Sequence, residues 1–522
     1  MQLIKRIIMI RKIFVIVIIT ITLGSCTKDF QKINVDPNSP ANVPLDYILG
    51  QTQLQIGGSA GDPGYATWRA NLIYALPAVQ QFSSLSTFYA GDKYIYQADL
   101  SEAYFNTMYP NSVKNLVNLI ELAKADPKDI NTLSIARILK VLQMSIITDL
   151  YGDVPYSEAG LGYLKLNYTP KYDDQQSIYM DMLKELDEAG KAFNTAAYVP
   201  AAADFVYGGD LAKWTKFANS LMLRLAMRMQ KVDPASAQTW AKKALDGGVM
   251  TNNSETFSIK YKNDGGTATI NSNSYNLGPA EKPTRNEVFK GSIQWSKTLI
   301  DLMTGRKDPR ISTISTLKNG DVTPANQKGL PNGLDPSTLQ ALTGETGSDA
   351  YSRPNAILYD EKDPCILLPY AEVELMKAEA IERGWYSGDA AGEYKAGQAA
   401  AISQLAVNTG APVISDADIA AYQNVNPYPA AGTFDEKFLQ IENEMFILTA
   451  STLNGFEGWA NYRRTGLPVL MPVNYPGNAT GGIIMRRLRY PGGEAGVNPN
   501  YKTASDKMGG DSFTSRMWWD KP

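Results

Sequence analysis

The stretch from Thr148 to Ala159 places Asp149 and Asp153 on either side of one turn, a spacing that could serve glycoside hydrolysis. A glycosidase needs two carboxyl groups about 5–9.5 Å apart across a cleft, and these two acids can approach each other that closely. Glu372 and Glu379 also share a helix face, but the helical rise separates them by about 10 Å. Acidic side chains are mostly exposed in folded proteins, so solvated or salt-bridged acids are the structural alternative.

A second charged group lies near the C-terminus, where Arg463 and Arg464 follow Glu457 and Trp459. Arginine forks pair bidentately with carboxylates, so this group could grip an anionic ligand. It could equally lock the last helix to a neighbouring element. Arginine is the usual choice for interface ion pairs and aromatic stacking, which favours the structural interpretation.

Aromatic side chains in or beside irregular segments are the better functional lead. Sugar rings stack on flat aromatic faces while amides and carboxylates bind the hydroxyl groups, and pockets of this type need few polar groups. Core packing is the alternative for each aromatic, because such a side chain buries a large area. The aromatics in question are Trp68, Phe82, Phe88, Tyr89, Tyr275 and Trp295.

Several reaction classes are excluded by composition. The 522 residues contain no histidine, which excludes Ser-His-Asp triads, Cys-His pairs and His-ligated zinc. The two cysteines, Cys26 and Cys365, are too few for a disulfide framework or for a thiolate metal site. We therefore expect neither a bound metal nor a cofactor.

The first 25 residues read as a targeting segment. A basic start precedes the apolar run from Ile13 to Leu23, which is too short to span a bilayer. The sequence Leu-Gly-Ser-Cys that ends at Cys26 looks like a bacterial lipobox, which implies cleavage before Cys26 and lipidation of this residue. An ordinary secretory signal followed by an accidental cysteine is the alternative. The basic residues are Lys5, Arg6, Arg11 and Lys12.

The mature chain is expected to be anchored to a membrane and not to span it. Residues 26–44 read as a lipidated tether, and no later segment is judged apolar enough to cross a bilayer. Removal of residues 1–25 takes four basic residues from the 50 and no acidic residue from the 53, which leaves a formal charge of −7. Without a long basic run, nucleic acid is an unsuitable partner.

Apolar residues at helical spacing predict a mainly α fold of repeated helix pairs. The segment from Asn131 to Leu150 is apolar on nearly all sides, which is typical of a buried helix. Asn131 is its expected N-cap, and Gly152 and Pro155 are expected to end it. Further helices are expected over 45–56, 68–82 with a kink at Pro77, 111–124, 172–193 with Asp173 as cap, 210–230, 235–245, 292–303, 369–385, 387–410, 435–450 and 456–463.

The helical pattern breaks between residues 249 and 364. This region has one expected strand, from Thr256 to Tyr261, and several turn-rich stretches. Long irregular segments in a compact protein are usually functional loops. We expect a helical-repeat scaffold with one loop-rich insertion at about 249–364, all within a domain over 45–522.

Ordered motifs along the mature chain resemble those of the SusD/RagB-like outer-membrane lipoproteins. The lipobox comes first and the stretch from Thr148 to Ala159 is the most specific. Each motif alone is modest, but their number and order cover the chain nearly end to end. The later motifs are Lys213–Leu221 with Arg224 and Arg228, Asp308–Arg310, Ala371–Glu374 with Ala378–Ala380, Glu457–Trp459 with Tyr462–Gly466, and Arg487–Pro491.

The resemblance implies a fold and a role. The implied fold has four tetratricopeptide-like helix pairs, a loop-rich ligand-binding insertion and little β structure. The implied role is that of a cell-surface, lipid-anchored lid of a SusC-like TonB-dependent transporter in the outer membrane, which captures oligosaccharides, or peptides in some members, for import. No catalysis is implied.

The family motifs lie on scaffold helices, so the candidate binding residues come only from residue type and location. They are Asp62, Trp68, Gln80, Tyr89, Tyr275, Trp295 and Arg353. Two other functions stay open at this point. One is a surface glycoside hydrolase that uses a carboxylate pair, and the other is a helical scaffold without a ligand.

Overall fold

The helix α9 (Ile130–Tyr151) is the element around which the others pack. The computed structural model describes residues 43–59, 62–261 and 292–522, so Cys26 and Tyr275 lie outside the described residues. Helix α9 contacts α3 (Leu45–Ile56), α8 (Lys114–Ala123), α11 (Gln175–Lys191), α12 (Leu211–Arg228) and α21 (Gly455–Thr465). A helix with neighbours on so many sides must be apolar around its circumference, as its sequence predicts.

The start of α9 differs from the prediction. Asn131 is not the N-cap but lies inside the helix, fully buried, because Asp129 precedes the first helical residue. The Asn131 amide instead donates to the carbonyl oxygens of Asn194 and Tyr198 at 2.8 and 2.9 Å. Its polar side chain thus ties the start of α9 to the segment after α11. A similar one-residue correction applies to Asp173: the N-cap of α11 is Asp174, whose carboxylate accepts from the Ser177 amide at 2.9 Å.

The end of α9 is set by Gly152. This residue has φ 87° and ψ −127°, a region that only glycine adopts readily. An added Cβ would lie 2.6 Å from the Met508 sulfur, so the C-terminal part of the chain packs directly on the turn. The Thr148 hydroxyl donates to the Gly152 carbonyl oxygen at 2.7 Å. The turn is therefore a packed joint between α9 and the chain that follows.

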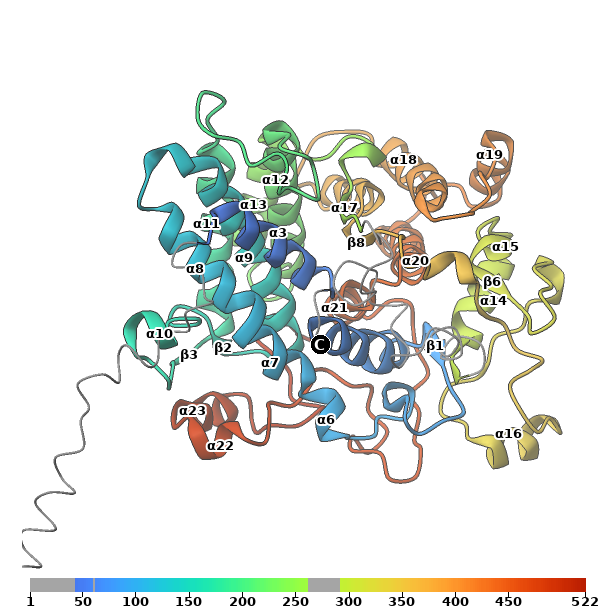
Figure 1. Cartoon of the computed structure of the whole chain (residues 1–522). Helices are drawn as coiled ribbons and strands as arrows, with labels where there is room; N and C mark the ends of the chain where they lie inside the picture. The colour runs from blue at the N-terminus through green and yellow to red at the C-terminus, as the bar shows by residue number, and fades with distance from the viewer. Residues whose placement is uncertain (1–42, 60–61, 262–291) are drawn as a thin grey trace, which may run out of the picture. The chain divides into compact units, whose positions relative to one another are not determined.

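Helix pairs form the scaffold, as the sequence predicts (Figure 1). Helices α9 and α11 pack together, and so do α12 and α13 (Pro234–Asp246), α17 (Tyr370–Glu382) and α18 (Ala390–Ser403), and α20 (Phe434–Ser451) and α21. The expected helix over 68–82 begins and ends earlier than predicted and is less regular. It consists of α4 (Asp62–Trp68), a π-helical turn (Arg69–Ala75) and α5 (Leu76–Ala78).

Strands are short in the described chain and form four antiparallel two-stranded pairs. The expected strand near residue 257 is present and pairs with the strand before α17. The insertion expected at about 249–364 holds half of the described strands, and its expected helix begins later than predicted, at Lys297. The pairs are β1 (Phe82–Ser83) with β5 (Gln294–Trp295), β2 (Val154–Pro155) with β3 (Tyr172–Asp173), β4 (Phe257–Ile259) with β8 (Cys365–Leu368), and β6 (Ser315–Thr316) with β7 (Arg353–Pro354).

The remaining helices are short or peripheral. They are α6 (Ala98–Ser101), α7 (Ala103–Met108), α10 (Gly162–Lys165), α14 (Lys297–Gly305), α15 (Ile311–Ile314), α16 (Pro336–Thr343), α19 (Asp416–Val425), α22 (Glu494–Val497) and α23 (Asn500–Lys507).

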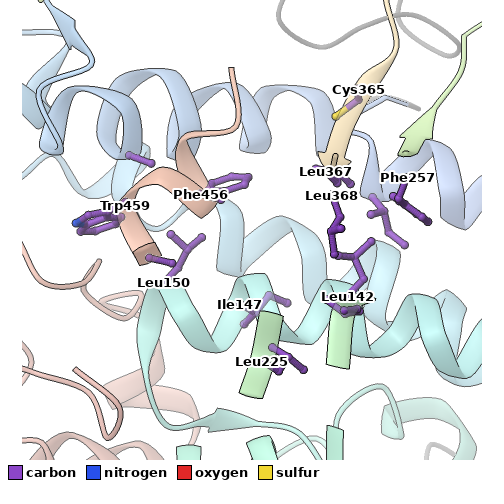
Figure 2. Packing of buried hydrophobic residues seen from close by; sticks show 14 of the residues in the cluster. Leu142, Ile147, Leu150, Leu225, Phe257, Cys365, Leu367, Leu368, Phe456 and Trp459 are labelled. Carbon is purple, nitrogen blue, oxygen red and sulfur yellow. The ribbon is translucent and has the colours of Figure 1, made fainter. Parts of the chain in front are cut away.

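One hydrophobic core joins the scaffold helices. Figure 2 shows Leu142, Ile147 and Leu150 of α9 together with Leu225 of α12, Leu367 and Leu368 of β8, and Phe456 and Trp459 of α21. Residues 45–522 form one compact unit around this core.

The segment Pro127–Tyr151 is long and apolar enough to cross a membrane, contrary to the expectation that no later segment is. Most of this segment is buried inside the protein, so its apolar surface serves the core.

Candidate functional site

The acids and arginines of the scaffold motifs form buried ion pairs and not a catalytic centre. Asp149 accepts hydrogen bonds from the Tyr179 hydroxyl at 2.5 Å and the Trp519 indole at 2.9 Å. The Arg228 guanidinium lies 3.4 Å from its other oxygen. Burial raises the pKa of Asp149, and Arg228 opposes that rise. This carboxylate is therefore a buried, paired group of the core and is not available to a substrate.

Space beside Asp149 is too small for a sugar. A cavity of about 20 Å³ lies there, whereas ligand pockets measure about 300–1,000 Å³. Asp153 does not complete a carboxylate pair, because it accepts from the Gln175 backbone amide at 2.9 Å. The structure thus gives no support to glycoside hydrolysis at this turn.

Arg463 and Arg464 of α21 bind neighbouring elements of the protein, which is the structural interpretation that arginine favours. Arg463 donates to the carbonyl oxygens of Asp149 and Arg486 at 2.6 and 2.8 Å. Arg464 bonds to Glu379 at 2.7 Å and to Glu442 at 3.0 Å. Both arginines are buried, so neither is offered to a ligand.

A second buried cluster surrounds Arg310 in the family-like Asp308–Arg310 motif. Arg310 pairs with Asp308 at 2.5 Å and with Glu444 at 2.6 Å. Arg306 bonds to the other oxygen of Glu444 at 3.1 Å, and the Tyr422 hydroxyl donates to Glu444 at 2.6 Å. The insertion is thereby joined to α20 through charged side chains that water does not reach.

Three segments far apart in sequence meet beside the β1–β5 pair, and we call this region the loop surface: residues 62–97, 292–354 and 471–482. The Ser83 hydroxyl donates to the Pro331 carbonyl oxygen at 2.9 Å, and the Asn332 amide donates to the Phe82 carbonyl oxygen at 2.6 Å. The Ala479 backbone amide donates to the Tyr94 carbonyl oxygen at 2.8 Å. These bonds fix irregular backbone that no regular sheet or helix supports.

A buried ion pair anchors the loop over residues 84–97. Lys93 and Asp92 are buried and lie 3.0 Å apart, and the Lys93 ammonium also donates to the Ser84 carbonyl oxygen. The Asp92 carboxylate accepts from the backbone amides of Ser84 and Gly333 at 3.2 and 3.4 Å. Burial raises the pKa of Asp92, while Lys93 opposes the rise. Nothing in the sequence distinguishes this pair from two solvated charges in a loop.

Phe88 is an exposed aromatic on the loop surface, and the partly buried Trp68 lies beside it. Their ring centres lie 5.9 Å apart at an angle of 38°, and Phe88 is 42% exposed. Tyr89 packs edge-on against Phe88 at 5.4 Å but is itself buried. The buried indole nitrogen of Trp68 has no hydrogen-bond partner in the described structure. The Trp68–Phe88 pair thus offers flat apolar faces beside polar loop groups.

The other candidate residues lie at or beneath the loop surface. Asp62 is exposed at the first position of α4. Gln80 is buried, with its amide donating to the Met471 carbonyl oxygen and accepting from Thr298 at 3.0 Å. Trp295 is completely buried and donates to the Ile314 carbonyl oxygen at 3.0 Å. Its predicted role as an exposed stacking residue is therefore not supported.

Arg353 is also buried, on β7. Its nearest carboxylate oxygen, on Asp349, is 3.9 Å away, and burial lowers the pKa of the guanidinium. Strand β7 lies next to β5, because the Trp295 backbone amide donates to the Ser352 carbonyl oxygen at 2.9 Å. Gln80, Tyr89, Trp295 and Arg353 therefore support the loop surface from below, while Asp62 and Trp68 lie on it.

Sequence reasoning gave too little weight to Phe88. Its type and its place in a loop were visible signals, but its exposure follows from tertiary structure. Among the described residues, no group of three histidine, cysteine or acidic side chains is placed to hold a metal ion. The loop surface is accordingly suited to binding by stacking and hydrogen bonding.

Comparison with protein families finds one match that covers most of the chain. A SusD-like family model described as "Starch-binding associating with outer membrane" matches residues 63–491. Comparison with curated protein sequences finds no match.

Solved structures with the same fold include proteins that bind chitin. A structure titled as a chitin-binding protein is 34% identical, with a TM-score of 0.81 over 92% of this chain and 100% of that chain. A SusD-like protein of Bacteroidetes AC2a is 27% identical, with a TM-score of 0.79 over 92% and 100%. A chitin-binding SusD homologue from Flavobacterium johnsoniae is 25% identical, with a TM-score of 0.73 over 91% and 98%.

Proposed function

The chain belongs to the SusD-like family, and from this premise we propose that it is a glycan-binding lipoprotein of the outer membrane. Homologues of this family are binding proteins and not enzymes, so the chain is a binding protein as well. The family description names starch, and two structural relatives are titled as chitin-binding. The proposed ligand is therefore an oligosaccharide, built either of β-linked N-acetylglucosamine, as in chitin, or of α-linked glucose, as in starch. Peptides are the alternative.

The observation that carries this proposal is the pair of the exposed Phe88 and the partly buried Trp68 on a loop surface held rigid from below. Pyranose rings present flat C–H faces that pack on aromatic rings, and a rigid surface loses little conformational entropy on binding. The Lys93–Asp92 pair supplies that rigidity, because it ties residues 84–93 to Gly333. Asp62 and Trp68 remain proposed contacts, and Tyr275 is proposed without a structural position.

The wider assembly is part of the same proposal. Residues 1–25 serve as a lipoprotein signal peptide, Cys26 carries the lipid, and residues 26–44 form the tether to the domain over 45–522. The protein acts as the lid of a SusC-like TonB-dependent transporter and faces the cell exterior. Family membership and the lipobox at Cys26 support this arrangement.

Calorimetric titration with chito-oligosaccharides and malto-oligosaccharides tests the proposed ligand class. We expect Trp68→Ala and Phe88→Ala each to weaken binding about fivefold or more, since even flat nucleobases stacked on an aromatic side chain gain about 1–3 kcal/mol. Tyr198→Ala, which removes an exposed tyrosine far along the chain, is the matched control and should keep full affinity. Unchanged affinity in both loop variants would show that the glycan binds elsewhere.

A further inference from the structure

A hollow of about 320 Å³ lies among α8, α9, α11 and the segment that contains α10, outside the loop surface. One part of its lining is apolar and comes from Val117 and Ile120 of α8, Leu133 of α9 and Leu161. Its volume is in the range of small-molecule sites. None of the residues proposed to bind the glycan lines this hollow.

Lys140 contributes a partly buried positive charge to the hollow. Its ammonium lies 4.8 Å from the centre of the Tyr156 ring, and it makes no ion pair among the described residues. Burial lowers the pKa of Lys140, and the nearby carboxylates of Glu185 and Asp181 only partly offset this effect. A carboxylate at this position would relieve that penalty.

The acidic groups nearby are already engaged. Glu185 bonds to Arg137 through both oxygens at 2.7 and 3.0 Å, and Arg137 also pairs with Glu188 at 2.7 Å. Glu121 pairs with Lys124 at 2.7 Å. Asp181 accepts the Tyr156 hydroxyl at 2.7 Å. Among the cationic groups of the described lining, Arg137 and Lys124 are paired, while Lys140, which is partly buried, and Lys165, which is exposed at the rim, have no ion-pair partner and can meet an incoming anion.

An exposed apolar strip continues from the hollow. Leu161 and Lys165 line the hollow, and the same short segment exposes four large side chains within six residues. Contiguous exposed apolar area of this kind usually marks an interaction site. Leu166 has φ 55°, an unusual conformation for leucine that turns the chain between the two halves of the strip. The exposed fractions are 53% for Tyr163, 40% for Leu164, 73% for Leu166 and 72% for Tyr168.

From these features we propose that the hollow binds an amphiphilic carboxylate. Its carboxylate pairs with the Lys140 ammonium, and its hydrocarbon chain packs against Val117, Ile120 and Leu133. A longer chain continues past Leu161 onto the exposed strip. The proposal is independent of glycan binding, since it uses elements on which the Trp68–Phe88 pair does not lie.

Isothermal titration of the purified chain with octanoate, octanol and octylamine tests the proposal. We expect octanoate to bind at least tenfold more tightly than the two other probes, because charge-assisted pairing requires the carboxylate. Affinity should rise about fourfold for each methylene group added from hexanoate to decanoate, as expected for burial of the chain.

Two variants separate the parts of the site. Lys140→Met keeps most of the side-chain volume and should lower octanoate affinity at least tenfold. Leu166→Asn suits the left-handed backbone and should reduce the gain from chain length while octanoate still binds. Lys242→Met is the control, because Lys242 is an exposed lysine on α13 that pairs with Asp246.

Equal binding of octanol and octanoate, or unchanged octanoate binding by Lys140→Met, would overturn the proposal and indicate adsorption to the apolar strip alone. Association weaker than millimolar for every chain length would also overturn it. Chito-oligosaccharide binding by Lys140→Met should stay at the wild-type level, so failure of this proposal and failure of glycan binding are separate results.

Discussion

At the scale of single residues, the structure changes the meaning of the charged motifs. In the sequence, Asp149 is a candidate catalytic acid, Arg228 and Arg310 lie in family-like motifs, and Glu444 belongs to no motif. In the fold each is buried and paired. Burial of such a pair is costly unless both partners are present, so these residues specify how helices meet.

The first residue-scale prediction concerns Glu444, which joins Arg306 and Arg310. Glu444→Gln leaves both guanidinium groups buried without their shared counter-charge. We expect the free energy of unfolding to fall by about 3–5 kcal/mol, as for other broken buried pairs. Chemical denaturation measures the change. Asp301→Asn, which breaks an exposed i,i+4 pair with Lys297, should cost less than about 0.5 kcal/mol. Equal effects of the two substitutions would contradict the structural role of Glu444.

A second prediction concerns pH. Burial and a hydrogen bond with Glu393 raise the pKa of Glu374 to about 8. An unfolded glutamate titrates near pH 4.3, about four units lower, so the folded protein holds an extra proton between these two values. The free energy of unfolding should therefore fall as pH rises from about 4 to 8.

Glu374→Gln mimics the protonated acid and tests this pH dependence. It should flatten the decline and leave the variant more stable than the wild type at pH 8.5, by about 1–3 kcal/mol. Thermal or chemical denaturation across the pH range provides the measurement. Glu121→Gln, at an exposed position on α8, should keep the wild-type profile. A variant with the same pH slope as the wild type would show that another group titrates.

At the scale of elements, the joint after α9 is the most constrained turn. Gly152→Ala introduces both an unfavourable backbone conformation and a Cβ that would lie 2.6 Å from the Met508 sulfur. We expect destabilisation of about 2–4 kcal/mol, measured by the denaturation midpoint. Gly305→Ala at the end of α14 meets nothing within 4 Å and should be neutral or slightly stabilising. A neutral Gly152→Ala would show that the turn relaxes easily.

The scaffold was predictable from the sequence because helical periodicity is a local property. Helices α3, α12, α13, α20 and α21 begin and end within two residues of their predicted bounds. The predicted caps Asn131 and Asp173 show the limit of this reasoning. Both side chains form hydrogen bonds with residues distant along the chain and do not cap a helix. The π-helical turn over Arg69–Ala75 carried no local signal.

The candidate site was less predictable than the scaffold. Residue type identified Trp68 and Phe88 as aromatics beside loops, but it could not show that Trp295 and Tyr89 are buried. Exposure in this region depends on pairing between segments about 200 residues apart, such as β1 with β5. Burial at the site is therefore a long-range property that a single sequence does not reveal.

At the scale of the whole molecule, the proposed lipid anchor gives a prediction about location. Cys26→Ala should abolish metabolic labelling with palmitate and release the protein from the outer-membrane fraction. The wild type should stay in that fraction and co-purify with a TonB-dependent barrel. Cys365→Ala is the matched control, because Cys365 is a buried thiol in β8. Continued labelling of the Cys26→Ala variant would contradict the assigned lipidation site.

Helix α9 has a consequence for biogenesis. Export as a lipoprotein requires the chain to pass through the inner membrane unfolded, when the apolar segment Pro127–Tyr151 is not yet covered by its neighbours. A secretion channel releases sufficiently apolar segments sideways into lipid, and a basic residue near the middle of such a segment opposes this by about 2.5–3.5 kcal/mol. Arg137 and Lys140 lie in the middle of α9. On the proposed export route, the two basic residues thus let a helix apolar enough for a bilayer pass through the channel and become the centre of a folded domain.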